Sequence, residues 1–276
     1  GSTQAPMTIT KYNKPDSSKI TFKTLDSDSP VRVRAILAEA KPETTLFVIS
    51  SKSGGTIEPR LALRAVRDAV ADRISEEELV QHLVAITDPG SMLERQAREE
   101  GWAAVFSGQP TVGGRFSALS VFGLLPAALV GIDLEEFMAH AIDAERQCSE
   151  DAIDNPAIGL ASFLYDNYLQ GRNKFTFLTQ KRGRVLGLWI EQLVAESLGK
   201  DGQGILPNIE VDSLLLKKDP GDRSAIVYLT RNDLWDERRN FEMSLSYIDP
   251  AIPRANYKID SVEELAEHFV MWEYAI

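Results

Sequence analysis

The sequence predicts an α/β protein built on parallel strands with helices on both faces. Residues 46–49 (LFVI) form a short apolar run rich in β-branched and aromatic types, as in a strand that is buried on both faces. A helical pattern of apolar residues follows this run, and the same alternation recurs along the chain. Ligands of such sheets bind at the carboxyl ends of the strands, so the loops that follow the strands are the candidate binding segments.

Length and composition are those of an ordinary globular protein. The 276 residues are 43% hydrophobic and 26% charged, which suits two modest domains or one large one. We expect a domain boundary near Asn155-Pro156, because a strand–loop–helix theme starts again after it. The predicted domains are therefore 1–155 and 156–276.

Charge and cysteine content narrow the classes of partner. The net charge of −11 argues against a nucleic acid or an anionic membrane surface as the main partner. Cys148 is the only cysteine and the three histidines are far apart, so no internal disulfide can form and a metal site is not expected. The longest apolar stretch, 116–132, is interrupted by Ser, Gly and Pro, which indicates a buried helix rather than a membrane span. We expect a cytoplasmic protein.

Turn and cap signals divide the first half of the chain into elements. The run Asp-Ser-Asp-Ser-Pro at 26–30 supplies helix caps, and Asp-Pro-Gly-Ser at 88–91 ends one strand and caps the next helix. The predicted order is an exposed connection at 7–19, strand 20–25, helix 31–40, strand 46–49, a helix reaching 71, strand 83–87, helix 92–100, strand 102–106 and the buried helix 116–132.

The second half repeats the alternation after an acidic stretch. Residues 134–155 carry many carboxylates and are expected to be a largely solvated helix and linker. A capping box, Ser261 to Glu264, opens the final helix. The predicted order is helix 157–170, strand 175–179, a basic turn at 180–184, helix 185–198, strands 225–230 and 243–248, and helix 261–274.

The loop after the first buried strand, Ser-Ser-Lys-Ser-Gly-Gly-Thr at 50–56, is the strongest binding signal. Its glycines let the backbone approach a ligand, its hydroxyls can donate, and the helix that follows offers free N–H groups to an anion. The alternative is an ordinary turn with a Ser or Thr cap. Four hydroxyls, two glycines and a lysine in seven residues favour a phosphate cradle.

Two further segments have a functional and an ordinary interpretation. Gly113-Gly114-Arg115 precedes the apolar stretch and is either a tight turn with a surface arginine or a cation aimed at an oxyanion. Gln192 and Glu196 lie four residues apart and so share one helix face. Glu196 comes near the unfavourable end of the helix dipole, which suits a proton-accepting base, although from the residues alone a solvated glutamate is the commoner case.

Three motifs in order carry a family resemblance. SSKSGGT (50–56), VGGRFS (112–117) and ESLGK (196–200), with the phrases LVAITDPGS (83–91) and FSALSVFGLLPAAL (116–129), resemble glucose-6-phosphate isomerase. The resemblance runs over most of the chain and is strongest to a divergent bacterial branch that includes fusions to transaldolase. It implies two sugar-isomerase domains, each a doubly wound parallel sheet flanked by helices.

The resemblance also implies roles for residues. Ser51, Ser53 and Thr56, with the backbone of Lys52, would hold the phosphate of glucose 6-phosphate or fructose 6-phosphate. Arg115, with Gly114, would face the developing enediolate oxygen. Glu196 would be the base that moves a proton between C2 and C1, and Gln192 would line the same pocket.

The family implies no metal or organic cofactor, and it implies a homodimer for the full-length protein. Two alternatives stay open: a non-catalytic, regulatory domain that binds a sugar phosphate, and an isomerase for mannose phosphate or for two sugars. A sensor needs the phosphate loop but no base, so Glu196 distinguishes it from an enzyme.

The chain departs from the family pattern at its ends. Gly1-Ser2 resembles the tail of the family's first phosphate loop, which gives Ser2 a phosphate-binding role, or it is a cloning scar. The Gly-Gln-His context of the ring-opening histidine does not occur, and His268 belongs to the last predicted helix. We therefore expect an internal fragment of a longer isomerase.

Overall fold

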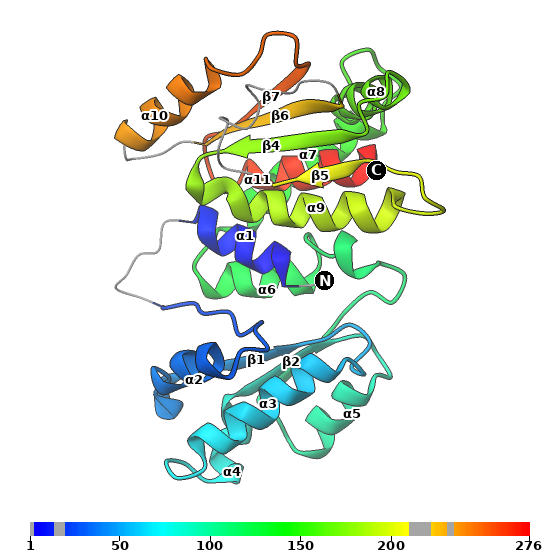
Figure 1. Ribbon diagram of the computed structural model, residues 1–276. Coiled ribbons are helices and arrows are strands. Elements are labelled where there is room, and N and C mark those ends of the chain that lie inside the picture. Colours follow the sequence, from blue (N-terminus) through cyan, green and yellow to red (C-terminus); the bar gives the residue numbers. More distant parts are fainter. Residues whose placement is uncertain (1–2, 14–19, 210–221, 231–234) are drawn as a thin grey trace. The chain divides into compact units, whose positions relative to one another are not determined.

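Two compact units make up the chain in the computed structural model, which describes residues 3–13, 20–209, 222–230 and 235–276. The first unit comprises Gly1–Pro6 and Ser17–Pro126, and the second comprises Met7–Asp16 and Ala127–Ile276. Each unit is built on one parallel sheet (Figure 1).

The first unit has a sheet of three parallel strands in the order β1-β2-β3. Phe47 pairs with Leu83, and Val84 pairs with Ala104. The elements of this unit are α2 (Pro30–Ala38), η1 (Pro42–Thr44), β1 (Phe47–Ser50), α3 (Ile57–Val70), α4 (Glu76–Leu79), η2 (Val80–His82), β2 (Leu83–Thr87), α5 (Met92–Glu99), β3 (Ala104–Ser107) and η3 (Gly114–Phe116). Helix α6 (Val121–Leu129) follows and runs past the end of the unit.

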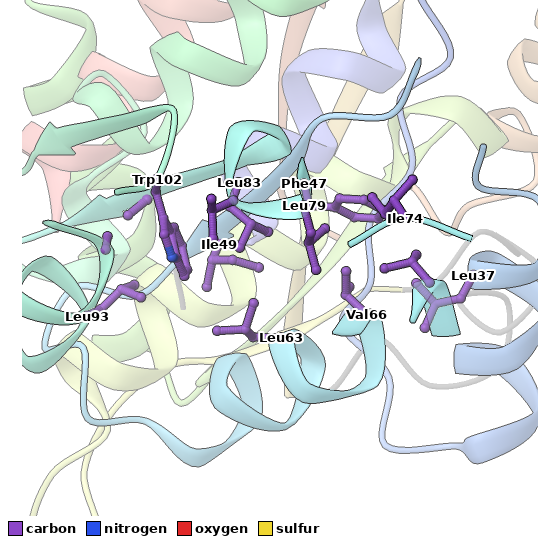
Figure 2. Close-up of a cluster of buried hydrophobic side chains, with 14 residues drawn as sticks. Leu37, Phe47, Ile49, Leu63, Val66, Ile74, Leu79, Leu83, Leu93 and Trp102 are labelled. Atoms are coloured by element: carbon purple, nitrogen blue, oxygen red, sulfur yellow. The ribbon is translucent and has the colours of Figure 1, made fainter. Parts of the chain in front are cut away.

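One face of the first sheet carries the core of this unit. Strands β1 and β2 contribute alternate residues to it, because successive side chains of a strand point to opposite faces. Helices α3 and α5 add side chains at helical spacing, and Trp102 closes the cluster (Figure 2). The buried members include Phe47, Ile49, Leu63, Val66, Val70, Leu83, Ala85, Leu93 and Ala97.

The second unit has a sheet of four parallel strands in the order β5-β4-β6-β7. The chain passes from β4 to β5 on one side and then crosses to β6 on the other, as in a doubly wound sheet. The elements are α7 (Leu134–Ser149), α8 (Pro156–Leu169), β4 (Lys174–Thr179), η4 (Lys181–Gly183), α9 (Arg184–Leu198), β5 (Leu206–Asn208), β6 (Arg223–Thr230), α10 (Trp235–Leu245), β7 (Arg254–Ile259) and α11 (Leu265–Ala275).

Helices cover both faces of the second sheet (Figure 1). On one face Leu178, Ala225 and Val227 pack with Phe241 of α10. The other face is aromatic: Phe175 lies 6.0 Å from Trp272 of α11, between ring centroids. Both predicted features, parallel strands and flanking helices, are therefore present.

A chain of hydrogen bonds runs through the aromatic face. Trp272 Nε1 donates to Tyr228 Oη at 2.9 Å, and Tyr228 Oη lies 3.0 Å from His268 Nδ1. Burial lowers the pKa of His268 to about 4, so its ring is neutral at pH 7. The Nε2 proton then points to the Lys258 carbonyl at 3.2 Å, and Nδ1 accepts from the tyrosine. His268 is thus a satisfied core residue.

Side-chain caps explain where several helices begin. Ser91 Oγ accepts a hydrogen bond from Glu94 N at 3.0 Å at the start of α5, as the Asp-Pro-Gly-Ser signal predicted. Asp133 caps α7, and Asn155 caps α8 by accepting from two backbone N–H groups. These caps satisfy donors that have no partner within their helix.

The unit boundary falls at 126–127 rather than at 155–156. Helix α7, expected to be largely solvated, buries Phe137 and lies against α11. Tyr274 of α11 donates to Glu145 of α7 at 2.9 Å, and His140 is hydrogen bonded to Glu267. The acidic stretch therefore belongs to the second unit.

Several predicted elements are wrong. Residues 20–25 form no strand, and part of the predicted exposed connection is helix α1 (Gln4–Tyr12), in which Thr8 and Ile9 are fully buried. The apolar stretch 116–132 is helical only over η3 and α6, because serine hydroxyls stabilise a tight turn between them. The predicted strand 243–248 overlaps the end of α10, and the strand of this region is β7.

Candidate functional site

The loop between β1 and α3 brings three hydroxyls together. Thr56 Oγ1 lies 3.3 Å from Ser51 Oγ and 3.4 Å from Ser53 Oγ. Thr56 is the N-cap of α3, yet its side chain accepts no capping hydrogen bond. The N–H groups of Ile57 and Glu58, which have no acceptor within their own helix, therefore lie at the hydroxyl cluster, which is the arrangement that binds anions at helix N-termini.

Gly54 gives this loop its shape. Its φ of +64° is a left-handed conformation that favours glycine. A Cβ at this position would lie 2.8 Å from Leu93 N and 2.9 Å from Ser91 Cβ. The loop therefore packs directly against the start of α5, and only glycine fits at position 54 without displacing the backbone of α5.

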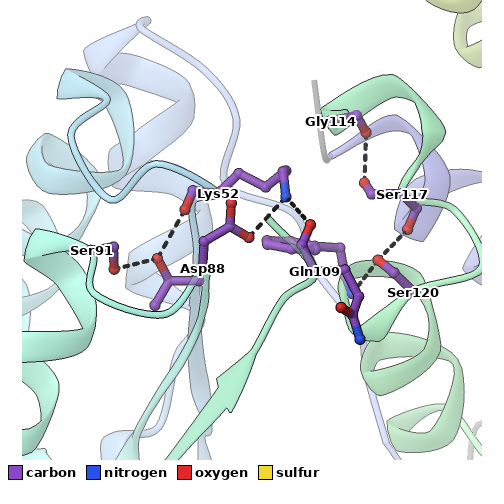
Figure 3. A network of polar contacts seen from close by, with 9 residues as sticks. Lys52, Asp88, Ser91, Gln109, Gly114, Ser117 and Ser120 are labelled. Atoms are coloured by element: carbon purple, nitrogen blue, oxygen red, sulfur yellow. Dashed lines mark hydrogen bonds and ion pairs between the residues drawn. The ribbon is translucent and has the colours of Figure 1, made fainter. Parts of the chain in front are cut away.

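The Lys52 side chain is committed to neighbouring loops. Lys52 Nζ donates to Asp88 Oδ1 at 2.8 Å and to the Gln109 carbonyl at 2.8 Å (Figure 3). It also lies 5.6 Å from the centroid of the Phe122 ring. The side chains of Lys52 and Asp88 are only 19% and 18% exposed. The ammonium is thus paired, whereas the hydroxyls of Ser51 and Ser53 lie within hydrogen-bond distance of the Thr56 hydroxyl.

Gly114 and Arg115 lie in the short helix η3. Ser117 Oγ donates to the Gly114 carbonyl at 2.6 Å, and Ser120 Oγ donates to the Ser117 carbonyl at 2.8 Å. The Arg115 guanidinium carbon lies 5.1 Å from the centroid of the Phe116 ring. The turn that carries the arginine is therefore held by its own serines, and the cation rests on an aromatic face.

Gln192 and Glu196 touch each other on α9. Gln192 Nε2 donates to Glu196 Oε1 at 3.0 Å, which confirms the predicted common face. Glu196 is exposed and lies in the last turn of the helix, and Gln192 is half-buried. A carboxylate so oriented by an amide can accept a proton from a ligand.

The candidate residues fall in both units. Ser51, Lys52, Ser53, Thr56, Gly114 and Arg115 belong to the first unit. Gln192 and Glu196 belong to the second. Ser2 lies outside the described residues.

Sequence reasoning missed Asp88 and Gln109 as neighbours of the loop. Both follow a strand, β2 and β3 respectively, and the carboxyl ends of parallel strands lie at the same edge of a sheet. This rule could have predicted from the sequence that Asp88 and Gln109 lie near the loop. In the described part of the chain, no three His, Cys, Asp or Glu residues are grouped as a metal ion would need.

Comparison with known sequences decides the family. The family model described as phosphoglucose isomerase matches residues 1–212. The chain belongs to the phosphoglucose isomerase family. The predicted resemblance is therefore confirmed.

Curated members of this family are similar along most of the chain. The glucose-6-phosphate isomerase of Synechococcus sp. (strain JA-3-3Ab) is 37% identical over 262 residues, which is 92% of this chain and 48% of the relative. That of Trichormus variabilis is 34% identical over 220 residues, which is 76% of this chain and 41% of the relative. The chain thus spans less than half the length of these phosphoglucose isomerases.

Solved structures confirm the α/β sugar-isomerase fold. A hypothetical protein from Thermus thermophilus superposes with a TM-score of 0.83 at 23% identity, covering 99% of this chain and 75% of that one. A glucose-6-phosphate isomerase from Chlamydia trachomatis superposes with a TM-score of 0.76 at 18% identity, covering 99% and 62%. No helix in the described part of the chain combines the length and hydropathy of a bilayer span.

Proposed function

We propose that this chain is the part of a glucose-6-phosphate isomerase that supplies one phosphate loop, the enediolate-stabilising arginine and the base. The reaction interconverts glucose 6-phosphate and fructose 6-phosphate through a cis-enediolate. The observation that carries this proposal is the convergence of the Ser51, Ser53 and Thr56 hydroxyls at the start of α3, in a chain that belongs to the family.

Phosphate is held through dipoles in this proposal. The hydroxyls of Ser51, Ser53 and Thr56 and the N–H groups at the start of α3 donate to the phosphate oxygens. The backbone of Lys52 takes part, since its side chain is paired elsewhere. Binding of the remote phosphate holds the sugar in register while the chemistry occurs at C1 and C2.

Glu196 transfers the proton between C2 and C1 of the sugar. Its carboxylate removes the proton from C2 of the open-chain aldose, and the C–H electron pair forms the C1–C2 double bond of the enediolate. The charge collects on O1, and Arg115 with the Gly114 backbone stabilises it. The same carboxyl group returns the proton to C1 while the proton on O2 moves to O1, which forms the C2 carbonyl and the C1 hydroxyl of the ketose. Gln192, hydrogen bonded to Glu196, orients the base.

Isomerase assays of the full-length protein test this proposal. Glu196→Gln should lower kcat for glucose 6-phosphate by about 10²–10⁴-fold, the usual range for loss of a general base. Ser53→Ala should mainly raise KM, because the phosphate is bound in both the ground state and the transition state. Glu191→Gln, an exposed glutamate of the same helix, is the matched control and should leave both constants unchanged.

The same assay separates the alternatives. Wild-type protein that binds the sugar phosphate without turnover would be a regulatory sugar-phosphate-binding domain. Turnover of mannose 6-phosphate at a comparable kcat/KM would indicate a mannose-phosphate or dual-specificity isomerase. Unchanged turnover in Glu196→Gln would contradict the assignment of the base.

A further inference from the structure

One ammonium group contacts the loops that follow all three strands of the first sheet. Lys52 follows β1, Asp88 follows β2 and Gln109 follows β3. Lys52 Nζ donates to the Asp88 carboxylate and to the Gln109 carbonyl, each at 2.8 Å (Figure 3). Two of the three ammonium protons are thus directed to fixed acceptors.

The same ammonium touches both ends of the segment that carries Arg115. Gln109 begins this segment and Phe122, whose ring centre lies 5.6 Å from Nζ, ends it. Phe122 is 1% exposed, so its ring is a fixed point in the core. Both ends of the segment therefore lie against one ammonium group, and Gly114 and Arg115 lie between the two ends.

Tight packing and backbone bonds support this arrangement. A Cβ on Gly108 would lie 2.5 Å from Asp88 Oδ1 and 2.6 Å from the Phe122 ring, so the three residues are in close contact. The Lys52 carbonyl accepts from Asp88 N at 3.0 Å, which fixes the backbone of the lysine to the loop after β2. The Lys52–Asp88 ion pair is therefore fixed at the ends of strands β1 and β2.

We propose that Lys52, held by Asp88, is a positioning residue that sets the place of the Arg115 segment relative to the phosphate loop. This inference rests on the proposed function, in which the loop binds phosphate and Arg115 stabilises the enediolate. Lys52 belongs to the phosphate loop itself, at 51–56, and its side chain reaches across to 109–122. The distance between the two groups that bind the substrate is then set by one side chain.

This role predicts an effect on kcat rather than on KM. Loop hydroxyls and N–H groups continue to bind phosphate when the ion pair is lost, so ground-state affinity is kept. A displaced arginine no longer meets the enediolate oxygen, and a misplacement of about 1 Å can lower the rate about 100-fold. A purely structural role would instead lower stability and leave the kinetics of the folded enzyme unchanged.

Hydrogen exchange on this chain tests the mechanical part without any activity. Lys52→Met and the nearly isosteric Asp88→Asn should speed amide exchange both in 51–56 and in 109–117. Arg64→Met is the matched control: its exposed ion pair with Asp68 lies on α3 of the same unit, and exchange in both segments should stay as in the wild type. Faster exchange confined to 51–56, or no change in either segment, would overturn the proposal.

Kinetics of the full-length protein test the functional part. In Lys52→Met and Asp88→Asn we expect kcat to fall about 10–100-fold with KM within about threefold of the wild type, and the double variant to match Lys52→Met. A raised KM at unchanged kcat, or a lower melting temperature with unchanged kinetics, contradicts the positioning role. Absence of isomerase activity in the wild type would refute the proposed function instead, while the exchange measurement still decides whether the lysine holds the segment.

Discussion

Gly54→Ala should destabilise the first unit and disturb the candidate phosphate loop together. At φ +64° an L-residue costs about 1–2 kcal/mol relative to glycine. The added Cβ would also lie 2.8 Å from Leu93 N, and a backbone atom cannot rotate away. Relief of such overpacking costs about 1–3 kcal/mol more, while the stiffer unfolded chain returns about 0.4–1 kcal/mol. Together these terms give an expected loss in free energy of unfolding of about 1–4.5 kcal/mol.

Gly90→Ala provides the control for the backbone term. Gly90 also has a positive φ, +77°, but a Cβ there would have no atom within 4 Å. Its substitution should cost only the dihedral strain, about 1 kcal/mol. The free energy of unfolding of this unit can be measured in both variants from the rate of amide hydrogen exchange in peptides of β1 and β2 at increasing urea concentrations.

Agreement between the two variants would refute the reasoning. If Gly54→Ala costs no more than Gly90→Ala, the close approach of the loop to α5 does not constrain it. A second readout is the rise in melting temperature produced by a five-carbon sugar-acid phosphate, an enediolate mimic. This rise should shrink in Gly54→Ala and persist in Gly90→Ala, because only the former displaces the hydroxyl cluster.

Two further predictions concern the second unit. Burial raises the pKa of Glu273 to about 8, so the folded chain keeps a proton that the unfolded chain loses above its ordinary pKa of 4.5. This contribution to stability is lost as pH rises from 4.5 through 8. At pH 7 the free energy of unfolding of Glu273→Gln should therefore exceed that of the wild type by about 1–3 kcal/mol. If the melting temperatures of both proteins changed equally between pH 4.5 and pH 8, the prediction would be contradicted. Tyr228→Phe leaves Trp272 Nε1 and His268 Nδ1 unpaired in the core and should cost about 2–4 kcal/mol in urea unfolding, and a loss below about 0.5 kcal/mol would refute the hydrogen-bond chain.

The sequence predicted those elements whose residue pattern is compatible with only one type of secondary structure. The buried run at 46–49 matches β1, and the run at 83–87 matches β2 to the residue, because continuous apolar stretches between turn signals suit buried parallel strands. Edge strands give no such signal. Strand β7 carries Arg254 and Lys258 on an exposed face and follows Pro253, so its sequence resembles a loop.

The misassigned strand at 243–248 shows how two periods can coincide. Its residues alternate apolar and polar, which predicts a strand. Phe241, Leu245 and Ile248 also recur at helical spacing, and these are the side chains that pack with the sheet. Packing against the sheet favoured the helical pattern over the strand pattern. A short segment of sequence does not show which side chains will pack against the sheet.

The candidate site divides in the same way. Contacts within a few residues followed from the sequence: the hydroxyls of Ser51 and Thr56, and the Gln192–Glu196 pair. The Lys52–Asp88 pair, 36 residues apart, depends on how adjacent strands end. Sequence motifs thus indicate which groups are present, and the sheet decides which of them meet.

Pairing of Lys52 alters how an acidic chain can hold a phosphate. The chain carries a net charge of −11, so a phosphate experiences general repulsion on approach. The one lysine of the loop is neutralised by Asp88, and the remaining donors are dipoles: hydroxyls and N–H groups at the start of α3. Such donors act at contact distance and discriminate by geometry, because the field of a dipole falls faster with distance than that of a charge. On the proposed function, charge in this unit therefore serves orientation through Lys52 and transition-state stabilisation through Arg115, while phosphate recognition depends on the shape that Gly54 permits.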